Sequence, residues 1–119
     1  MARLTDPDLL AKFRQALNDW RTEGSIELIG RAHDGLRTTL EGLTVRGFKE
    51  TLFRFVCEDN GEIDQVKEER EPWRDKWEWH FDLRPVIHGI KVYIETRLFP
   101  ESFSSKKEPI IYIVQIKRA

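Results

Sequence analysis

The chain contains little cysteine and no long apolar run. Its 119 residues include one cysteine, Cys57, which excludes an internal disulfide and suits a reducing compartment. No apolar stretch approaches the length of a membrane-spanning helix, and the first residues lack the pattern of a signal peptide. These absences predict a cytoplasmic protein.

An excess of charge of one sign is also missing. The net charge is −1, whereas nucleic-acid-binding domains are usually distinctly basic. The distribution is uneven, because residues 58–82 contain ten acidic residues against four Lys or Arg. Residues 83–119 contain seven Lys or Arg against three acidic residues. Any polyanion would therefore be attracted to the C-terminal third of the chain.

Motifs for cofactors, metals and nucleophilic catalysis are absent as well. The chain has no Gly-rich phosphate loop and no dinucleotide fingerprint. Its histidines, His33, His80 and His88, have no Cys or carboxylate partners at zinc-like spacing. Cys57 follows an apolar helix end and is most simply a small buried hydrophobe. We therefore expect no cofactor and no metal.

Helical patterns occupy the first half of the chain. A length of 119 residues with 39% hydrophobic content predicts a single domain spanning residues 1–119. Asp6 and Pro7 are typical of a helix start, and Gly24 is expected to end that helix. Further helices are predicted over residues 31–41 and 45–56, and residues 25–29 are a turn or an edge strand.

Alternation of apolar and polar residues dominates the second half. Residues 77–83 and 90–98 are apolar at every second position, or nearly so, which predicts half-buried antiparallel strands. A weaker strand is expected at 63–66 and a last one at 110–117, after a mobile polar loop between Pro100 and Pro109. Helices followed by strands indicate an α+β fold, with the helices packed on one face of an antiparallel sheet and the other face uncovered.

The uncovered face of the predicted strands carries polar and charged side chains. Histidine transfers protons near neutral pH, and Lys and Arg stabilise the negative charge that develops on a phosphate. Tyrosine can bind a phosphate or stack on a base. The face therefore suits binding and cleavage of a phosphodiester, although a solvated face with ordinary cross-strand pairs is the simpler alternative. Its members are Glu78, His80, Asp82, Arg84, Lys91, Tyr93, Glu95, Arg97 and Lys117.

Several short motifs, in order along the chain, resemble a known family. Residues 79–85 (WHFDLRP), the Val-Tyr-Ile of residues 92–94 and the Val-Gln-Ile-Lys of residues 114–117 resemble the MqsR family. Residues 9–24 and 42–47 are similar to its first helix and to the entry into its next helix. The members are toxins of bacterial type II toxin–antitoxin systems and belong to the RelE-like group.

The resemblance implies a RelE-like α+β fold and an mRNA interferase that cuts without a metal. It also implies a protein antitoxin, encoded nearby, that holds the toxin inactive. The family's functional set is a Lys, a Gln, a Tyr and a C-terminal Lys. Tyr93 and Lys117 match the tyrosine and the terminal lysine, His80 stands where the family has glutamine, and Lys67 is the best candidate for the remaining lysine. The slightly negative net charge and the longer loop before residue 110 depart from the family.

We therefore expect an endoribonuclease in which a 2′-hydroxyl attacks the adjacent phosphate and leaves a cyclic phosphate. A non-catalytic RelE-fold module is the alternative, binding a protein partner at the sheet face or at an exposed edge formed by residues 110–117. It could also bind RNA without cutting it, with Trp73, Trp77 and Trp79 stacking on bases, although packing of these rings in the core or over the sheet edge is the simpler interpretation. The expected catalytic residues are His80, Tyr93, Lys117 and Lys67. The expected RNA-binding residues are Arg97, Lys91, Arg84 and His88.

Overall fold

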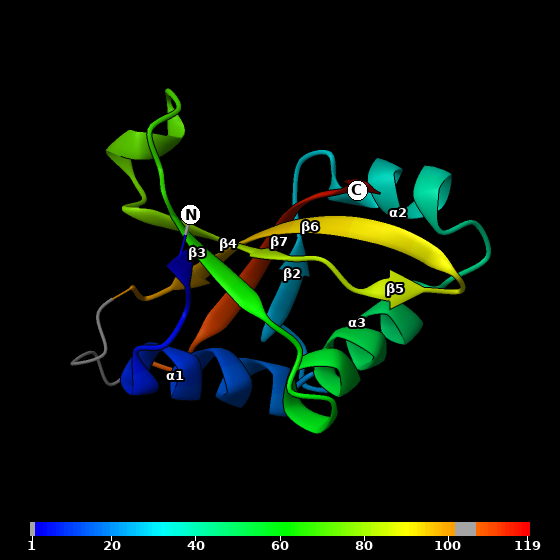
Figure 1. The fold of residues 1–119 in the computed structure, drawn as a ribbon, viewed down its shortest axis with the longest axis horizontal. Helices are drawn as coiled ribbons and strands as arrows, with labels where there is room; N and C mark the ends of the chain where they lie inside the picture. Colours follow the sequence, from blue (N-terminus) through cyan, green and yellow to red (C-terminus); the bar gives the residue numbers. More distant parts are fainter. Residues whose placement is uncertain (1, 102–106) are drawn as a thin grey trace.

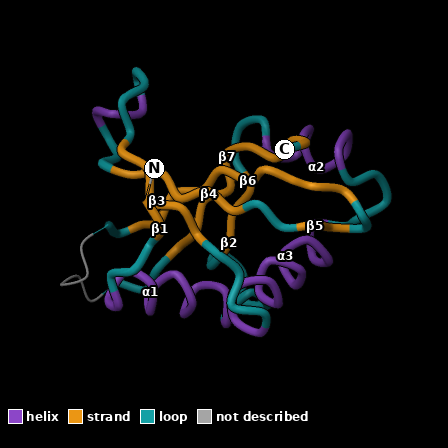
Figure 2. Tube along the Cα trace, viewed as in Figure 1, coloured by secondary structure: helices purple, strands orange, loops and turns teal. Residues whose placement is uncertain are grey.

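The computed structural model describes residues 2–101 and 107–119 as helices arranged around a mixed sheet (Figures 1 and 2). Half of the loop expected to be mobile at residues 100–109, namely residues 102–106, lies outside these ranges. The helices are α1 (Pro7–Asn18), α2 (Ala32–Thr39) and α3 (Val45–Phe53), followed by a π-helical turn (Arg54–Glu58) and a later 3-10 turn (Trp73–Asp75). The strands are β1 (Ala2–Arg3), β2 (Ile26–Leu28), β3 (Ile63–Lys67), β4 (Trp79–Leu83), β5 (Val86–Ile87), β6 (Ile90–Phe99) and β7 (Ile110–Arg118).

Helix α1 begins where the sequence predicts and ends earlier. The Asp6 side chain accepts hydrogen bonds from the backbone N–H groups of Asp8 and Leu9, which would otherwise lack partners at the helix start. The predicted end at Gly24 was wrong, because the chain turns after Asn18. The Ser25 hydroxyl donates to the Asp19 carbonyl at 2.6 Å, which satisfies a group at the helix end.

The sheet is mixed, which corrects the expectation of a purely antiparallel one. Its order is β1-β3-β4-β6-β7-β2, and β5 pairs with β6 off this path. β2 runs parallel to β7, with Ile26 opposite Ile111, while the other pairs are antiparallel. The stretch at residues 25–29 is thus an edge strand. β7 lies between β6 and β2 along residues 111–113, so an exposed edge there was a wrong prediction.

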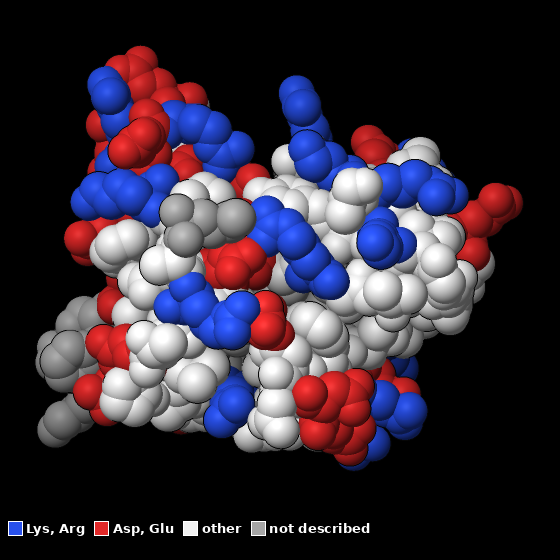
Figure 3. Space-filling model, in the orientation of Figure 1, with Lys and Arg blue, Asp and Glu red and all other residues white. Residues whose placement is uncertain are grey.

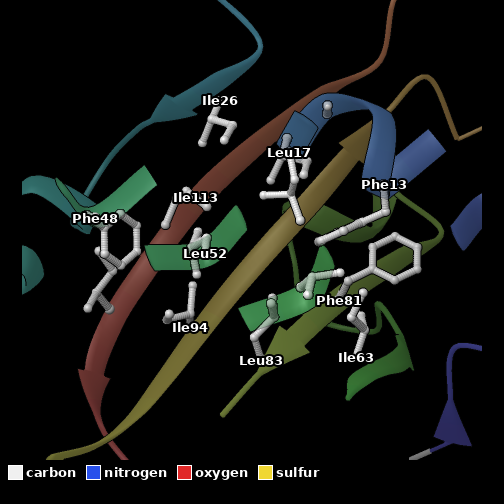
Figure 4. Packing of buried hydrophobic residues seen from close by; sticks show 14 of the residues in the cluster. Phe13, Leu17, Ile26, Phe48, Leu52, Ile63, Phe81, Leu83, Ile94 and Ile113 are labelled. Atoms are coloured by element: carbon white, nitrogen blue, oxygen red, sulfur yellow. The ribbon is translucent and has the colours of Figure 1, made fainter. Parts of the chain in front are cut away.

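The alternating strands bury one face, as the sequence predicts. Phe81 and Leu83 of β4 and Ile94 of β6 point into a core that also holds Phe13 of α1 and Phe48 of α3 (Figure 4). Helices α1 and α3 lie together on this side of the sheet (Figure 1). Across the described ranges, no helix is both long enough and apolar enough to span a membrane.

The opposite face of the sheet is covered in part, which corrects the expectation that this face would be uncovered. Residues 68–76 rise from the end of β3 on the side away from α1 and α3 (Figure 1). Glu68 is buried, and the ring of Trp73 stacks with the Arg97 guanidinium at 4.9 Å. The sequence pattern of this segment is charged and aperiodic, so nothing in its spacing predicts that it packs on the sheet.

Candidate functional site

The centre of the polar face is a buried network of charged side chains. The register of β4 and β6 places Asp82 directly opposite Glu95. The side chain of Arg97 is 0% exposed and donates to Glu95 Oε2 at 2.9 Å and to Glu68 Oε1 at 3.3 Å. Burial of a guanidinium is tolerated only when carboxylates pair with it. Arg97 therefore holds residues 68–73 against the sheet, and it offers no accessible surface for the RNA contact that the sequence predicts.

Arg70 completes the network from its solvent side. Its Nη2 donates to Glu95 Oε2 at 2.6 Å and to Glu68 Oε2 at 3.2 Å. Burial alone would raise the pKa of Glu95, but hydrogen bonds and charge from Arg70 and Arg97 outweigh it and lower that pKa. Glu95 therefore stays ionised and accepts from two guanidinium groups at once.

His80 lies against this network rather than in solvent. Its Nδ1 is 2.7 Å from Asp82 Oδ1, a hydrogen bond that orients the imidazole. Its Nε2 is 3.6 Å from Glu68 Oε2, which is longer than a hydrogen bond, and the side chain is 11% exposed. His80 Nδ1 is thus held in a hydrogen bond, whereas Nε2 makes no hydrogen bond and lies beneath residues 68–76.

Tyr93 occupies the more open part of the same face. The β6–β7 register pairs it with Lys117, whose Nζ lies 5.3 Å from the ring centre, and the Arg84 guanidinium lies 5.2 Å from that centre. The Tyr93 hydroxyl donates to Glu95 Oε1 at 3.3 Å. Burial, together with the charges of Asp82 and Glu95, raises the pKa of Tyr93, so the phenol keeps its proton. Two cations thus flank a hydrogen-bond donor.

Lys91 and His88, two predicted RNA-binding residues, lie at and near the turn that joins β5 to β6. Lys91 is exposed and stands two residues before Tyr93 on β6, so its side chain projects from the same face. His88 is exposed in the turn between β5 and β6, at a backbone φ of 51°. Lys91 extends the cationic surface around Tyr93, whereas His88 belongs to the hairpin tip.

Lys67 is the predicted site residue that the fold separates from the others. The register pairs Val66 with His80 and Lys67 with Trp79. Because successive strand residues point to opposite faces, Lys67 projects from the other side of the sheet. Its Nζ lies 5.4 Å from the Trp79 ring and 3.6 Å from Glu78 Oε1. His80, Tyr93 and Lys117 therefore share a face that Lys67 does not.

The sequence pattern missed Glu68 and Arg70, and it named Trp73 only as a base-stacking or packing residue, without its contact to Arg97. The one local signal is a tryptophan in an otherwise charged stretch. Of the other two tryptophans of that region, Trp79 packs on the core and Trp77 packs edge-on against Phe99 and Tyr112. The packing interpretation is therefore confirmed for Trp77 and Trp79.

One group of possible metal ligands gathers within the described residues. Single ligand atoms of His80, Asp82 and Glu95 lie within 4.8 Å of one another. Glu95 already accepts from Arg70 and Arg97, and His80 Nδ1 is bound to Asp82. A metal ion would have to displace these partners and face two fixed positive charges, so the geometry disfavours a metal centre.

A cavity of about 440 Å³ opens beside the network. Residues 29–31, which connect β2 to α2, form one wall, and residues 70–73 contribute Arg70 and Trp73 to the other. Glu95, Val114 and Gln115 line it from the sheet. In Figure 3 the surface is indented between the charged protrusion at the upper left and the neighbouring part of the molecule. The polar face is therefore hollowed next to Glu95.

Comparisons of the chain with protein-family models, curated proteins and solved structures found no match. The MqsR resemblance accordingly stays a prediction that rests on the short motifs quoted above.

Proposed function

We propose that this protein is a metal-independent mRNA endoribonuclease, a toxin of the MqsR type with a RelE-like fold, and that Tyr93 marks the centre of its site. The observation that supports the proposal is the arrangement of Arg84 and Lys117 on either side of the Tyr93 ring. The ordered pair of His80 and Asp82 lies on the adjoining strand. Cations around a protonated phenol suit a phosphate, and an oriented imidazole suits proton transfer.

The proposed reaction needs only groups of this chain and water. The phosphate contacts Arg84 and Lys117, which offset the charge that develops on its oxygens, and Arg84 is oriented by its ion pair with Asp64. The Tyr93 hydroxyl turns from Glu95 Oε1 to donate a hydrogen bond to the phosphate. His80 Nε2 accepts the proton of the 2′-hydroxyl while the 2′-oxygen bonds to phosphorus. The bond to the 5′-oxygen breaks, that oxygen takes a proton from water, and the resulting hydroxide takes the proton back from His80. A 2′,3′-cyclic phosphate and the starting form of His80 remain. Because Glu68 Oε2 lies 3.6 Å from Nε2, the Glu68 carboxylate has to turn away from this nitrogen when RNA binds, while residues 70–73 keep their place.

Purified protein incubated with a long mRNA in EDTA tests this proposal. We expect discrete products from the parent protein, and a loss of about 100-fold or more in His80→Ala, as is typical when a group that transfers protons is removed. Tyr93→Phe and Lys117→Ala should also cut more slowly. Lys67→Ala is the matched control, because that lysine projects from the opposite face and should leave cleavage unchanged.

Two results would contradict the proposed site. One is unchanged cleavage by folded His80→Ala and Tyr93→Phe proteins, and the other is a loss in Lys67→Ala as large as in Lys117→Ala. Circular dichroism of each variant separates loss of activity from loss of folding.

A non-catalytic RNA-binding module is the second candidate. The enclosure of His80 by Glu68 and Asp82 favours it, because every member of such a network can serve stability alone. Intact RNA together with measurable RNA binding by the folded protein would favour this function over cleavage.

We also propose, on the family resemblance alone, that a protein antitoxin encoded nearby controls the activity. Expression of this chain should then arrest growth, and co-expression of the neighbouring gene product should relieve the arrest. Relief by a neighbour that does not co-purify with this protein would contradict direct inhibition.

A further inference from the structure

We propose that the cavity beside Glu95 binds one unpaired nucleobase of the RNA, next to the phosphate held at Tyr93; this inference rests on the proposed endoribonuclease function. The cavity lies between residues 29–31 and residues 70–73. Its volume of about 440 Å³ falls in the range of roughly 300–1,000 Å³ that small-molecule sites occupy. It is therefore large enough for a base and its sugar.

The cavity combines an aromatic ring with hydrogen-bonding groups. Trp73 contributes a half-buried indole, and base stacking on aromatic rings is a usual mode of single-strand recognition. Gln115 contributes an amide that both donates and accepts, as needed to contact the edge of a base. Glu95 Oε1 accepts only the long bond from Tyr93, since Arg70 and Arg97 both bind Oε2. These groups match the faces and edges of a nucleobase.

A bulge in β7 explains why the sheet lines the cavity so closely. Glu95 pairs with Gln115 and Thr96 pairs with Ile113, so Val114 is an extra residue between them. Consecutive strand residues normally point to opposite faces, but Val114 and Gln115 both line this cavity. Bulges recur next to functional sites because they re-aim a side chain. Here the bulge brings an apolar contact and an amide to one hollow.

Two arginine side chains lie at the rim of the cavity. Arg31 and Arg70 line it, and both side chains are largely open to solvent. Within the described ranges, the side chains of Arg31 and Gln115 make no hydrogen bond or ion pair with another residue. Arg31 is therefore available for a backbone phosphate while Gln115 contacts the base.

The cavity continues directly from the proposed phosphate site. Glu95 is two residues from Tyr93 on β6, and Gln115 is two residues from Lys117 on the neighbouring strand. Two residues along a strand span about 7 Å, a distance that one nucleotide of an extended chain bridges. A strand whose phosphate contacts Lys117 and Tyr93 can thus place the adjoining base beside Trp73. This continuity is why we infer RNA rather than a free nucleotide.

Fluorescence anisotropy with labelled 2′-O-methyl octanucleotides of mixed sequence tests the inference without cleavage. We expect Trp73→Ala to bind about tenfold more weakly, and Trp73→Phe to stay within about threefold of the parent protein, because phenylalanine preserves stacking. Gln115→Leu and Arg31→Gln should also weaken binding. Arg74→Gln and Arg37→Gln are the matched controls, since these exposed arginines do not line the cavity.

The outcomes separate this inference from the proposed function. If Lys117→Gln weakens binding while the Trp73, Gln115 and Arg31 variants bind as the parent does, the base site is wrong and the phosphate site stands. If the parent protein binds no oligonucleotide, both fail together. Equal affinity for a nucleoside monophosphate and for the octanucleotide would also overturn the inference, because the cavity would then serve a free nucleotide. Gln115→Leu and Arg31→Gln keep the test decisive should Trp73→Ala unfold.

Discussion

Glu95 is the residue on which the buried charges of the polar face depend. It accepts from Arg70 and Arg97 through one oxygen and from Tyr93 through the other. Alternation correctly assigns Glu95 and Arg97 to the polar face, but it says nothing about exposure. Arg97 was expected to bind RNA, and it is instead the most enclosed cation of the site. The difference arises because residues 68–73 contribute the carboxylate and the ring that enclose it.

Glu95→Gln should destabilise the protein by about 3–5 kcal/mol, because the change removes the charge of one of the two carboxylates that pair with the buried Arg97 guanidinium and also breaks the ion pair with Arg70. Urea unfolding followed by circular dichroism measures this. Glu50→Gln is the control, since Glu50 pairs with Arg54 on an exposed helix face and such pairs contribute less than about 1 kcal/mol. Equal effects of the two substitutions would mean that the network of Glu95 is no stronger than a surface pair.

At the scale of elements, the low helix propensity of Gly35 gives the wrong expectation for helix α2. Gly35 lowers the helix-forming tendency of α2 by roughly 1 kcal/mol relative to alanine, so the sequence makes this helix less secure. Yet α2 forms over Ala32–Thr39, and its glycine lies against the backbone of β7. A Cβ at position 35 would lie 2.1 Å from the carbonyl oxygen of Ile116. The close approach of helix and strand requires the absence of a side chain.

Gly35→Ala should therefore destabilise the protein by about 1–3 kcal/mol, as overpacking does, despite the better helix propensity of alanine. Gly47→Ala in α3 is the matched control. A Cβ there would meet side-chain atoms of Leu43 and Thr44, at 3.0 and 3.1 Å, and no backbone atom, so we expect a smaller change. Thermal unfolding of the two variants gives the comparison. A stabilised Gly35→Ala protein would show that α2 does not pack on β7 this tightly.

Over the whole molecule, positive and negative charges nearly balance, but they gather in different parts of the chain. The net charge of −1 hides an acidic stretch that supplies Glu68 to the buried network and a C-terminal part that supplies Lys117 and Arg97. Lys and Arg are interspersed with Asp and Glu over the visible face (Figure 3). Binding of a polyanion would therefore depend on a few placed cations, and it should weaken with added salt.

The free energy of unfolding should be nearly constant at intermediate pH. It should fall at acid and at alkaline pH, where the groups with shifted pKa values change their charge. The pKa of Glu95 lies below its ordinary value of 4.5, so the stability that its ionised form contributes is complete above that pH and is lost on acidification. The pKa values of Tyr93 and Cys57 are raised above 10.0 and 9.0, so their contributions are lost as the pH rises through the raised values.

Urea midpoints measured across the pH range test this pH dependence. We expect Tyr93→Phe to lose less stability than the parent protein at alkaline pH. The urea midpoint of Glu95→Gln should fall less steeply than that of the parent protein at acid pH. A Tyr93→Phe protein that follows the parent at alkaline pH would contradict the enclosure of the phenol next to Asp82 and Glu95.

The sequence by itself determined four strands of the second half, β3, β4, β6 and β7, and the assignment of residues to the two faces of β4 and β6, but not β5 or the 3-10 turn. Local rules suffice there, since apolar alternation in β4 and β6 fixes which side chains face the core. Capping chemistry likewise fixed the start of α1 at Asp6. His80, Tyr93 and Lys117 therefore fall on one face, as the sequence predicts.

Only the tertiary structure decided what covers that face and which cations remain open on it. Glu68 and Trp73 reach Arg97, and Arg70 reaches Glu95, across a long sequence separation, so no local pattern encodes these contacts. The parallel pairing of β2 with β7 and the side from which Lys67 projects are likewise consequences of register. Burial depends on segments that meet only after folding, and this is why the exposed site centres on Tyr93 while Arg97 is enclosed.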